Sequence, residues 1–167
     1  YTDIVFTGST GYIWWGSPAG FVKRTPLEVS SFGVTVGDFN RDGWLDLAFL
    51  TWSNDPRVNN EGVVVWGGAA GFSIENSLRI PLTSATRASA GLTTADLNKD
   101  GWLDLIFPAG ESPGKTSEIV WGGPRGFGAV PHTVLHTNMV DSPGIADLNS
   151  DGWLDLIFPG GADYDTQ

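Results

Sequence analysis

The chain has 167 residues, 41% of them hydrophobic, no cysteine and a formal net charge of −10. Its hydrophobic content is that of a folded domain, and its charge argues against nucleic acid and anionic membrane surfaces as partners. No apolar run approaches the roughly 18 residues of a membrane helix, so we expect no direct membrane insertion. Without cysteine, disulfides and thiolate metal sites are excluded.

Short strands separated by glycine-rich turns are the elements that the sequence predicts, and they recur in one order along the chain. In each unit the first strand enters an acidic loop, the second leaves it, the third ends in a Trp-Gly pair and the fourth follows a Gly-Phe pair. In the first complete unit these strands are predicted over residues 33–37, 45–50, 63–66 and 72–82. The units lie at about 1–30 (partial), 31–83, 89–137 and 142–160 (partial).

The spacing of the repeat predicts the fold class. A period of about 50 residues with four strand-like runs is typical of β-propeller blades. We therefore expect an all-β chain, a single propeller segment over residues 1–167, built from blades of four antiparallel strands. About three blades' worth of strands is present, and Tyr1 aligns with Trp44 inside an acidic loop. We expect these blades to belong to a larger propeller or to an oligomer that completes the ring.

Three loops of the form Asp-x-Asn-x-Asp-Gly-x-x-Asp carry nine of the 19 acidic residues. Ca²⁺ prefers six to eight oxygen ligands. Side chains at loop positions 1, 3, 5 and 9, with the backbone carbonyl at position 7, can supply oxygens to one centre, and glycine at position 6 permits the sharp turn. Each loop is thus predicted to bind one Ca²⁺, about three in all. The expected ligands are Asp38, Asn40, Asp42, Trp44 and Asp46; Asp96, Asn98, Asp100, Trp102 and Asp104; and Asp147, Asn149, Asp151, Trp153 and Asp155.

Two other interpretations of these loops compete with the calcium interpretation. An EF-hand needs a bidentate Glu at position 12 and flanking helices, whereas this chain has Phe49, Phe107 and Phe158 there. Plain acidic turns would use the same residue types, because Asp, Asn and Gly are common turn residues. Three copies with identical ligand chemistry favour calcium over plain turns.

The acidic loop after a short strand, with Trp-Gly-x-x-x-Gly-Phe between its copies, resembles the FG-GAP/VCBS-type calcium-binding repeats. The loop motif occupies residues 37–49, 95–107 and 146–158, and the resemblance covers nearly the whole chain. Members of this family form β-propellers, usually of seven blades, as in integrin α-subunit heads and certain sugar-binding lectins. The resemblance implies calcium on the loop residues named above, where it would brace the link between the first two strands of a blade.

A polar and aromatic connection after the second strand of the first complete unit is the first candidate for a ligand-facing edge. It carries Trp52, Asn54 and Arg57, and loops of this kind often bind ligands; a solvated surface loop is the alternative. The tryptophans at loop position 7 either cover the loops or offer a stacking face to a sugar. The tryptophans of the Trp-Gly pairs are expected to pack between blades.

The function predicted from these features is a calcium-stabilised extracellular interaction or scaffold module, as in cell adhesion, and not an enzyme. Its partner would be another protein or further copies of the chain. The alternative is a carbohydrate-binding lectin with a glycan partner. A glycan-active enzyme is a third possibility, and it would need a carboxylate outside the loops, such as Glu61 or Glu118. Because calcium is millimolar outside cells, we expect an extracellular, periplasmic or cell-surface location.

Overall fold

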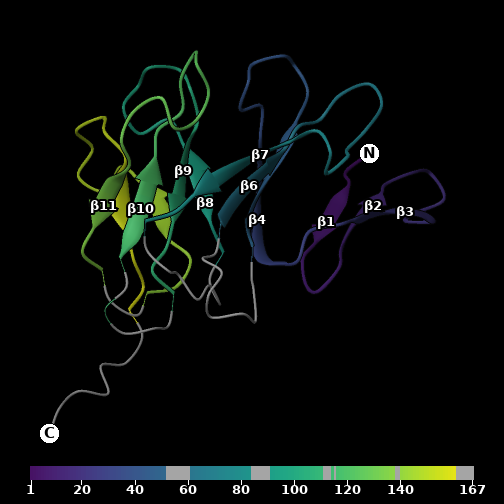
Figure 1. The fold of residues 1–167 in the computed structure, drawn as a ribbon, viewed down its shortest axis with the longest axis horizontal. Coiled ribbons are helices and arrows are strands. Elements are labelled where there is room, and N and C mark those ends of the chain that lie inside the picture. The colour runs from purple at the N-terminus through teal and green to yellow at the C-terminus, as the bar shows by residue number, and fades with distance from the viewer. Residues whose placement is uncertain (52–60, 84–90, 111–113, 115, 138–139, 161–167) are drawn as a thin grey trace, which may run out of the picture.

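Antiparallel strands make up the described fold. The computed structural model describes residues 1–51, 61–83, 91–110, 114, 116–137 and 140–160 (Figure 1). These residues form thirteen strands and no helix. Within them, therefore, no helix is long and apolar enough to cross a membrane. All pairings between the named strands are antiparallel, and the predicted all-β class is confirmed.

The strands form four sheets in which neighbours in the chain are neighbours in the sheet. The first sheet holds β1 (Ile4–Phe6), β2 (Gly11–Trp15) and β3 (Lys23–Leu27). The second holds β4 (Ser31–Gly37), β5 (Asp46–Thr51), β6 (Glu61–Val65) and β7 (Ser77–Pro81). The third holds β8 (Thr93–Ala95), β9 (Asp104–Phe107), β10 (Ser117–Val120) and β11 (Thr133–Leu135). The fourth pairs β12 (Gly144–Ala146) with β13 (Asp155–Ile157).

The prediction of a strand over residues 72–82 is wrong at its start, because β7 begins only at Ser77. Two successive turns occupy the preceding residues. The amide of Gly71 donates to the carbonyl of Gly68 at 2.8 Å, and the amide of Asn76 donates to the carbonyl of Ser73 at 3.0 Å. These local hydrogen bonds satisfy backbone groups that a longer strand would have paired across the sheet.

Residues of β5 and β6 alternate between two hydrophobic clusters, so both faces of the second sheet are covered. One cluster lies against the first sheet and consists of Ile13, Leu27, Val29, Leu47, Phe49, Val63 and Val65. The other lies against the third sheet and consists of Phe39, Ala48, Leu50, Val64, Ile80, Leu82, Leu92, Leu105, Phe107 and Val120. This burial explains why both strands are apolar at nearly every position, since a sheet with one face in water would alternate with polar residues.

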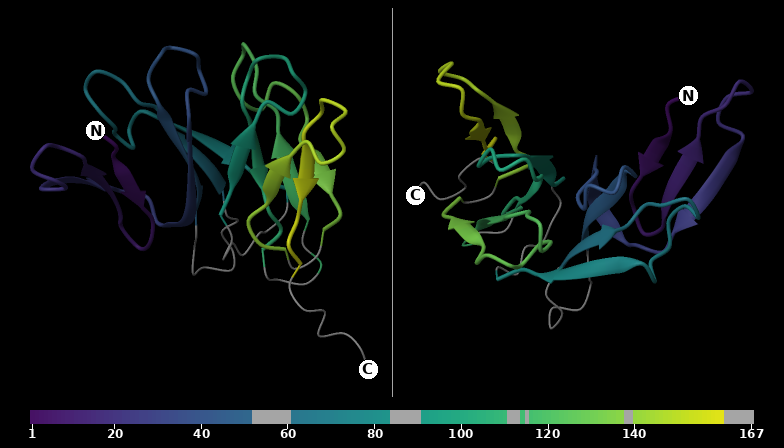
Figure 2. Two further views of the ribbon diagram at one scale, coloured as in Figure 1. Left: turned by 180° about the vertical axis from the view of Figure 1, so that it is seen from behind. Right: turned by 90° about the horizontal axis from the view of Figure 1, so that it is seen from above.

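The sheets follow one another along a curve when the molecule is seen from above (Figure 2). The three acidic loops, which join β4 to β5, β8 to β9 and β12 to β13, lie on the same side of the sheets (Figures 1 and 2). The repeat therefore places three chemically equivalent loops in a row along one rim of the molecule.

Candidate metal centre in three acidic loops

The three acidic loops share one backbone conformation. Position 6 is a glycine with positive φ in each loop, at 90° for Gly43, 85° for Gly101 and 87° for Gly152. Position 4 also has positive φ, although it is never glycine: the three residues there have φ of 59°, 60° and 60°. Non-glycine residues in this region are uncommon and persist where the surrounding structure determines them. The loop closure therefore dictates the backbone at position 4, whatever its side chain.

Side-chain oxygens from positions 1 and 3 converge on a single amide in the first loop. The amide of Asp42 donates to Asp38 Oδ1 at 3.1 Å and to Asn40 Oδ1 at 3.0 Å. Asp38 Oδ2 accepts from the amide of Gly43 at 3.0 Å, and Asp42 Oδ1 accepts from the amide of Trp44 at 2.8 Å. The side chains at positions 1, 3 and 5 thus all accept hydrogen bonds from backbone amides of the same loop.

The second and third loops reproduce this arrangement. The amides of Asp100 and Asp151 each lie 3.1 Å from the position 1 oxygen and 3.0 Å from the position 3 oxygen. The position 6 amide donates to the position 1 carboxylate, and the position 7 amide donates to the position 5 carboxylate. These distances are 2.9 Å in the second loop and 2.8 Å in the third. The structure therefore brings the side chains of positions 1, 3 and 5 together in all three loops.

The aspartate at position 9 has a second role that the sequence did not reveal. Asp46 is fully buried; its Oδ2 accepts from the amide of Phe39 and its Oδ1 from the amide of Gly67, both at 2.8 Å. Asp104 is fully buried as well and accepts from the amides of Leu97 and Gly122, both at 2.9 Å. Because a carboxylate has about four lone-pair sites, each keeps capacity for a further partner.

These contacts join the two signatures of the repeat, because Gly67 and Gly122 are the glycines of the Trp-Gly pairs. The first sheet repeats the link, with Asp3 Oδ1 accepting from the amide of Gly16 at 2.8 Å. A Cβ on Gly67 would lie 2.1 Å from the carbonyl oxygen of Leu45. Glycine is therefore required there for close approach of two backbone segments, and not for an unusual φ.

Burial controls the electrostatics of the position 9 carboxyl groups. Burial raises the pKa of Asp46 and of Asp104 above the ordinary value of 3.8. The amide hydrogen bonds to each carboxylate act in the opposite direction, and the carboxylates at positions 5 and 1 raise the pKa further. A cation bound among these groups would offset both the burial and the mutual repulsion of the charges.

The exposed Asp151 behaves differently. The amide of Trp153 holds its pKa below the usual value, with help from the Asn149 side chain and from the charge of Lys99. The hydrogen bonds favour the ionised carboxylate, which is the form that binds a metal ion.

The donor set of the loops suits a hard cation. Within the described residues, no three His, Cys, Asp or Glu side chains gather as a ready metal cluster. The first loop instead offers carboxylates, the Asn40 amide oxygen and the Trp44 carbonyl, all of them oxygen donors. The position 9 carboxylate is turned toward backbone amides, yet it lies near enough to Asp42 and Asp38 for their charges to raise its pKa. Oxygen donors of this kind fit Ca²⁺ better than Zn²⁺.

The tryptophans at loop position 7 differ in exposure. Trp44 and Trp153 are each 50% exposed, whereas Trp102 is half-buried. By contrast, Trp15 and Trp66 of the Trp-Gly pairs pack beside the hydrophobic clusters. Trp15 and Trp121 each donate their Nε1–H to a threonine hydroxyl, at 2.9 and 3.0 Å.

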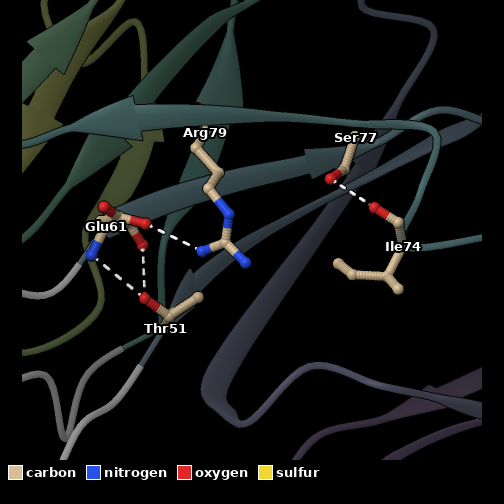
Figure 3. A network of polar contacts seen from close by, with 5 residues as sticks. All are labelled: Thr51, Glu61, Ile74, Ser77 and Arg79. Carbon is tan, nitrogen blue, oxygen red and sulfur yellow. Dashed lines mark hydrogen bonds and ion pairs between the residues drawn. The ribbon is translucent and has the colours of Figure 1, made fainter.

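The predicted ligand-facing edge, Trp52, Asn54 and Arg57, lies outside the described residues. The residues at either end of that connection form a polar network (Figure 3). The Thr51 hydroxyl donates to the carbonyl of Glu61 at 3.0 Å, and the amide of Glu61 donates back to this hydroxyl at 3.1 Å. Arg79 Nη1 lies 2.9 Å from Glu61 Oε2. Beside it, the Ser77 hydroxyl donates to the carbonyl of Ile74 (Figure 3).

The two carboxylates outside the loops that the sequence singled out have different environments. Glu61 forms the exposed pair with Arg79, with 36% of its side chain accessible. Glu118 is fully buried on β10; its Oε2 lies 3.0 Å from His132 Nδ1 and accepts from the amide of Thr83. Glu118 therefore ties the third sheet to the segment that follows β7.

Comparison with protein-family models gave no matching family, and a search of curated proteins gave no match.

Proposed function

We propose that each of the three acidic loops binds one Ca²⁺, and that the chain is a calcium-stabilised interaction or scaffold module built from propeller blades. One observation carries this proposal, and it recurs in three loops that share one backbone conformation. In each loop the side-chain oxygens of positions 1 and 3 converge on the position 5 amide, and the position 5 carboxylate accepts from the position 7 amide. Turns under no functional constraint would not need three ligand-type side chains at the same positions in every copy.

The carboxylates, the asparagine amide oxygen and the position 7 carbonyl would hold the ion. The bound ion would supply positive charge where three aspartates of one loop otherwise repel one another. The glycine at position 6 makes the turn. In the first two loops the buried aspartate at position 9 anchors the loop to the Trp-Gly glycine that follows β6 or β10. Calcium binding and folding of the loops are therefore linked.

The packing supports the propeller part of the proposal. The first three sheets, with three, four and four antiparallel strands, pack against one another through two apolar clusters. The meander order within each sheet is that of a propeller blade. An architecture of stacked repeats leaves loops at the rim free to contact a protein partner or further copies of the chain. Calcium sites of modest affinity would be filled outside the cell, so an exported location suits the module.

The test is thermal unfolding with calcium, with magnesium and with EDTA. Calcium at about 100 times its dissociation constant stabilises a one-site protein by about 2.7 kcal/mol, which corresponds to a rise in Tm of roughly 5–10 °C for a chain of this size. Magnesium, which demands tighter octahedral geometry, should give a smaller rise. An unchanged Tm after demonstrated removal of the metal would contradict the proposal.

A carbohydrate-binding lectin is the second candidate function. It is favoured by the half-exposed rings of Trp44 and Trp153, which stand at the loop rim and offer flat amphipathic faces. A glycan panel tests this candidate: binding that is lost in Trp44→Ala and in EDTA supports a lectin. Binding of no glycan in the presence of calcium leaves the interaction module as the function.

A further inference from the structure

The side chain at position 4 of one acidic loop reaches the tryptophan at position 7 of the next loop. Arg41 Cζ lies 5.1 Å from the centre of the Trp102 ring, and Lys99 Nζ lies 4.0 Å from the centre of the Trp153 ring. Both distances are within the range of a cation–π interaction. Position 4 of one loop thus contacts position 7 of the next loop twice. The first contact joins the second sheet to the third, and the second contact joins the third sheet to the fourth.

Each cation also lies beside the glycine that precedes that tryptophan. A Cβ on Gly101 would be 3.4 Å from Arg41 Nη1, and a Cβ on Gly152 would be 3.6 Å from Lys99 Nζ. Long side chains are unusual at positive φ, where glycine, asparagine and aspartate are favoured. Arginine and lysine at this position are therefore better explained by the contact that they make than by the turn itself.

We propose that Arg41 and Lys99 are positioning residues that couple each calcium loop to the loop of the following sheet. This inference rests on the proposed calcium function. Arg41 stands between Asn40 and Asp42, so an ion held by those neighbours fixes its backbone and the direction of its side chain. The guanidinium then holds Trp102, whose backbone carbonyl is the position 7 ligand of the second loop. Calcium in one loop thereby orders the next loop before its own ion binds.

The coupling between two loops is reciprocal and has a definite sign. Position 4 of the third loop is Ser150, so this loop has no cation that corresponds to Arg41 and Lys99. By linkage, the second loop tightens calcium binding in the first as much as the first tightens it in the second. A single cation–π contact supports a roughly fivefold change in affinity.

The positive charge of Arg41 and Lys99 would by itself weaken calcium binding in the following loop, whereas the proposed contact strengthens it. A cation beside an acidic loop repels Ca²⁺, and Lys99 is close enough to Asp151 to lower the pKa of that carboxyl. If the cations acted only through charge, removing one would tighten calcium binding in the following loop and would leave the loops independent. The two mechanisms therefore differ in a measurable quantity, which is the interaction between loops.

A thermodynamic cycle measures this interaction. Calcium titrations of the full chain are followed through the indole ¹H–¹⁵N resonance of Trp102, which reports on the second loop. Asp42→Ala disables the first loop and is expected to weaken the second loop roughly fivefold. In the Arg41→Gln background, the same Asp42→Ala change is expected to leave the second loop unaffected. Arg125→Gln removes one charge from an exposed arginine in the turn between β10 and β11 and should preserve the full effect of Asp42→Ala.

Three results would overturn the inference, and they are distinguishable from one another. Persistence of the Asp42→Ala effect in Arg41→Gln would mean that the coupling does not pass through the arginine. Independent loops in the wild type, with calcium still bound, would refute the coupling but leave the calcium function intact. Absence of calcium binding by the wild type would refute both. If Asp42→Ala does not fold, the same cycle is run with Asp100→Ala and Lys99→Gln, read at the Trp153 indole.

Discussion

Replacement of Gly67 by alanine tests the link between the Trp-Gly pair and the buried aspartate of the preceding loop. The new Cβ would lie 2.1 Å from the carbonyl oxygen of Leu45 and 3.0 Å from its carbon. An ordinary contact between carbon and oxygen is about 3.3 Å, so one of the two backbone segments must move by roughly 1 Å. That movement separates the Gly67 amide from Asp46 Oδ1, which now lie 2.8 Å apart.

The expected cost follows from these two effects. Forcing an extra carbon into a packed site costs about 1–3 kcal/mol. Leaving one oxygen of a fully buried carboxylate without its donor costs about 1–3 kcal/mol more. Gly67→Ala should therefore lower the free energy of unfolding by roughly 2–6 kcal/mol, which at a urea m-value of about 2 kcal/mol/M moves the midpoint by roughly 1–3 M.

The neighbouring glycine supplies a matched control. A Cβ on Gly68 meets no atom within 4 Å, so Gly68→Ala should change the stability by less than about 1 kcal/mol. Urea denaturation followed by tryptophan fluorescence compares the two variants with the wild type. Equal stability of Gly67→Ala and Gly68→Ala would refute the reasoning, because the two substitutions differ only in what the added methyl group contacts.

Three further predictions concern the carboxylates. Glu118→Ala should cost about 2–5 kcal/mol, because it empties a fully buried site and removes the acceptor of the Thr83 amide and the partner of His132. Glu61→Ala removes an exposed pair and should cost at most about 1 kcal/mol; similar losses in urea denaturation would contradict this. Asp42→Asn should reduce the rise in Tm caused by calcium and leave the Tm in EDTA unchanged, whereas Asp46→Asn should lower the Tm in both, since the buried carboxylate accepts two amides. If both variants changed the Tm in calcium and in EDTA in the same way, the aspartates at positions 5 and 9 would share one role. Because burial raises the folded-state pKa of Asp46 above 3.8, folding without calcium favours the protonated carboxyl, and stability falls as pH rises through the range between the two pKa values. Calcium needs the ionised carboxylate, so its stabilising effect should shrink as pH falls through that same range. Melting curves at pH 7 and at pH 3.8, the ordinary pKa of the group, with and without calcium, measure the change. A calcium effect that is equal at both pH values would contradict it.

The strand pattern could be read from the sequence because its causes are local. Apolar runs such as those of β5 and β6 predict strands covered on both faces, and turn residues separate them. The glycine at loop position 6 likewise predicts the turn that the three loops adopt. The start of β7 was missed because two turns compete with the strand, and nothing in the composition of residues 72–76 distinguishes them from a strand edge.

The contacts between distant residues could not be read from the sequence. Asp46 and Gly67 are separated by 21 positions, and only the pairing of β5 with β6 brings them together. The loop motif leaves position 4 unspecified, so it did not single out Arg41 and Lys99, whose partners belong to the next repeat. A useful signal was present nonetheless. Asp3, Asp46 and Asp104 are each followed, 13, 21 and 18 positions later, by the glycine of a Trp-Gly pair. The regular alternation of the acidic motif and the Trp-Gly motif suggests a physical link between them.

The most direct test of the calcium proposal is native mass spectrometry of the protein in a calcium-containing buffer. The account predicts about three bound Ca²⁺ per chain, and one fewer when Asp96 and Asp100 of the second loop are both replaced by alanine. A wild-type chain without bound calcium, or a count that the double substitution leaves unchanged, would contradict the assignment of the ions to these loops.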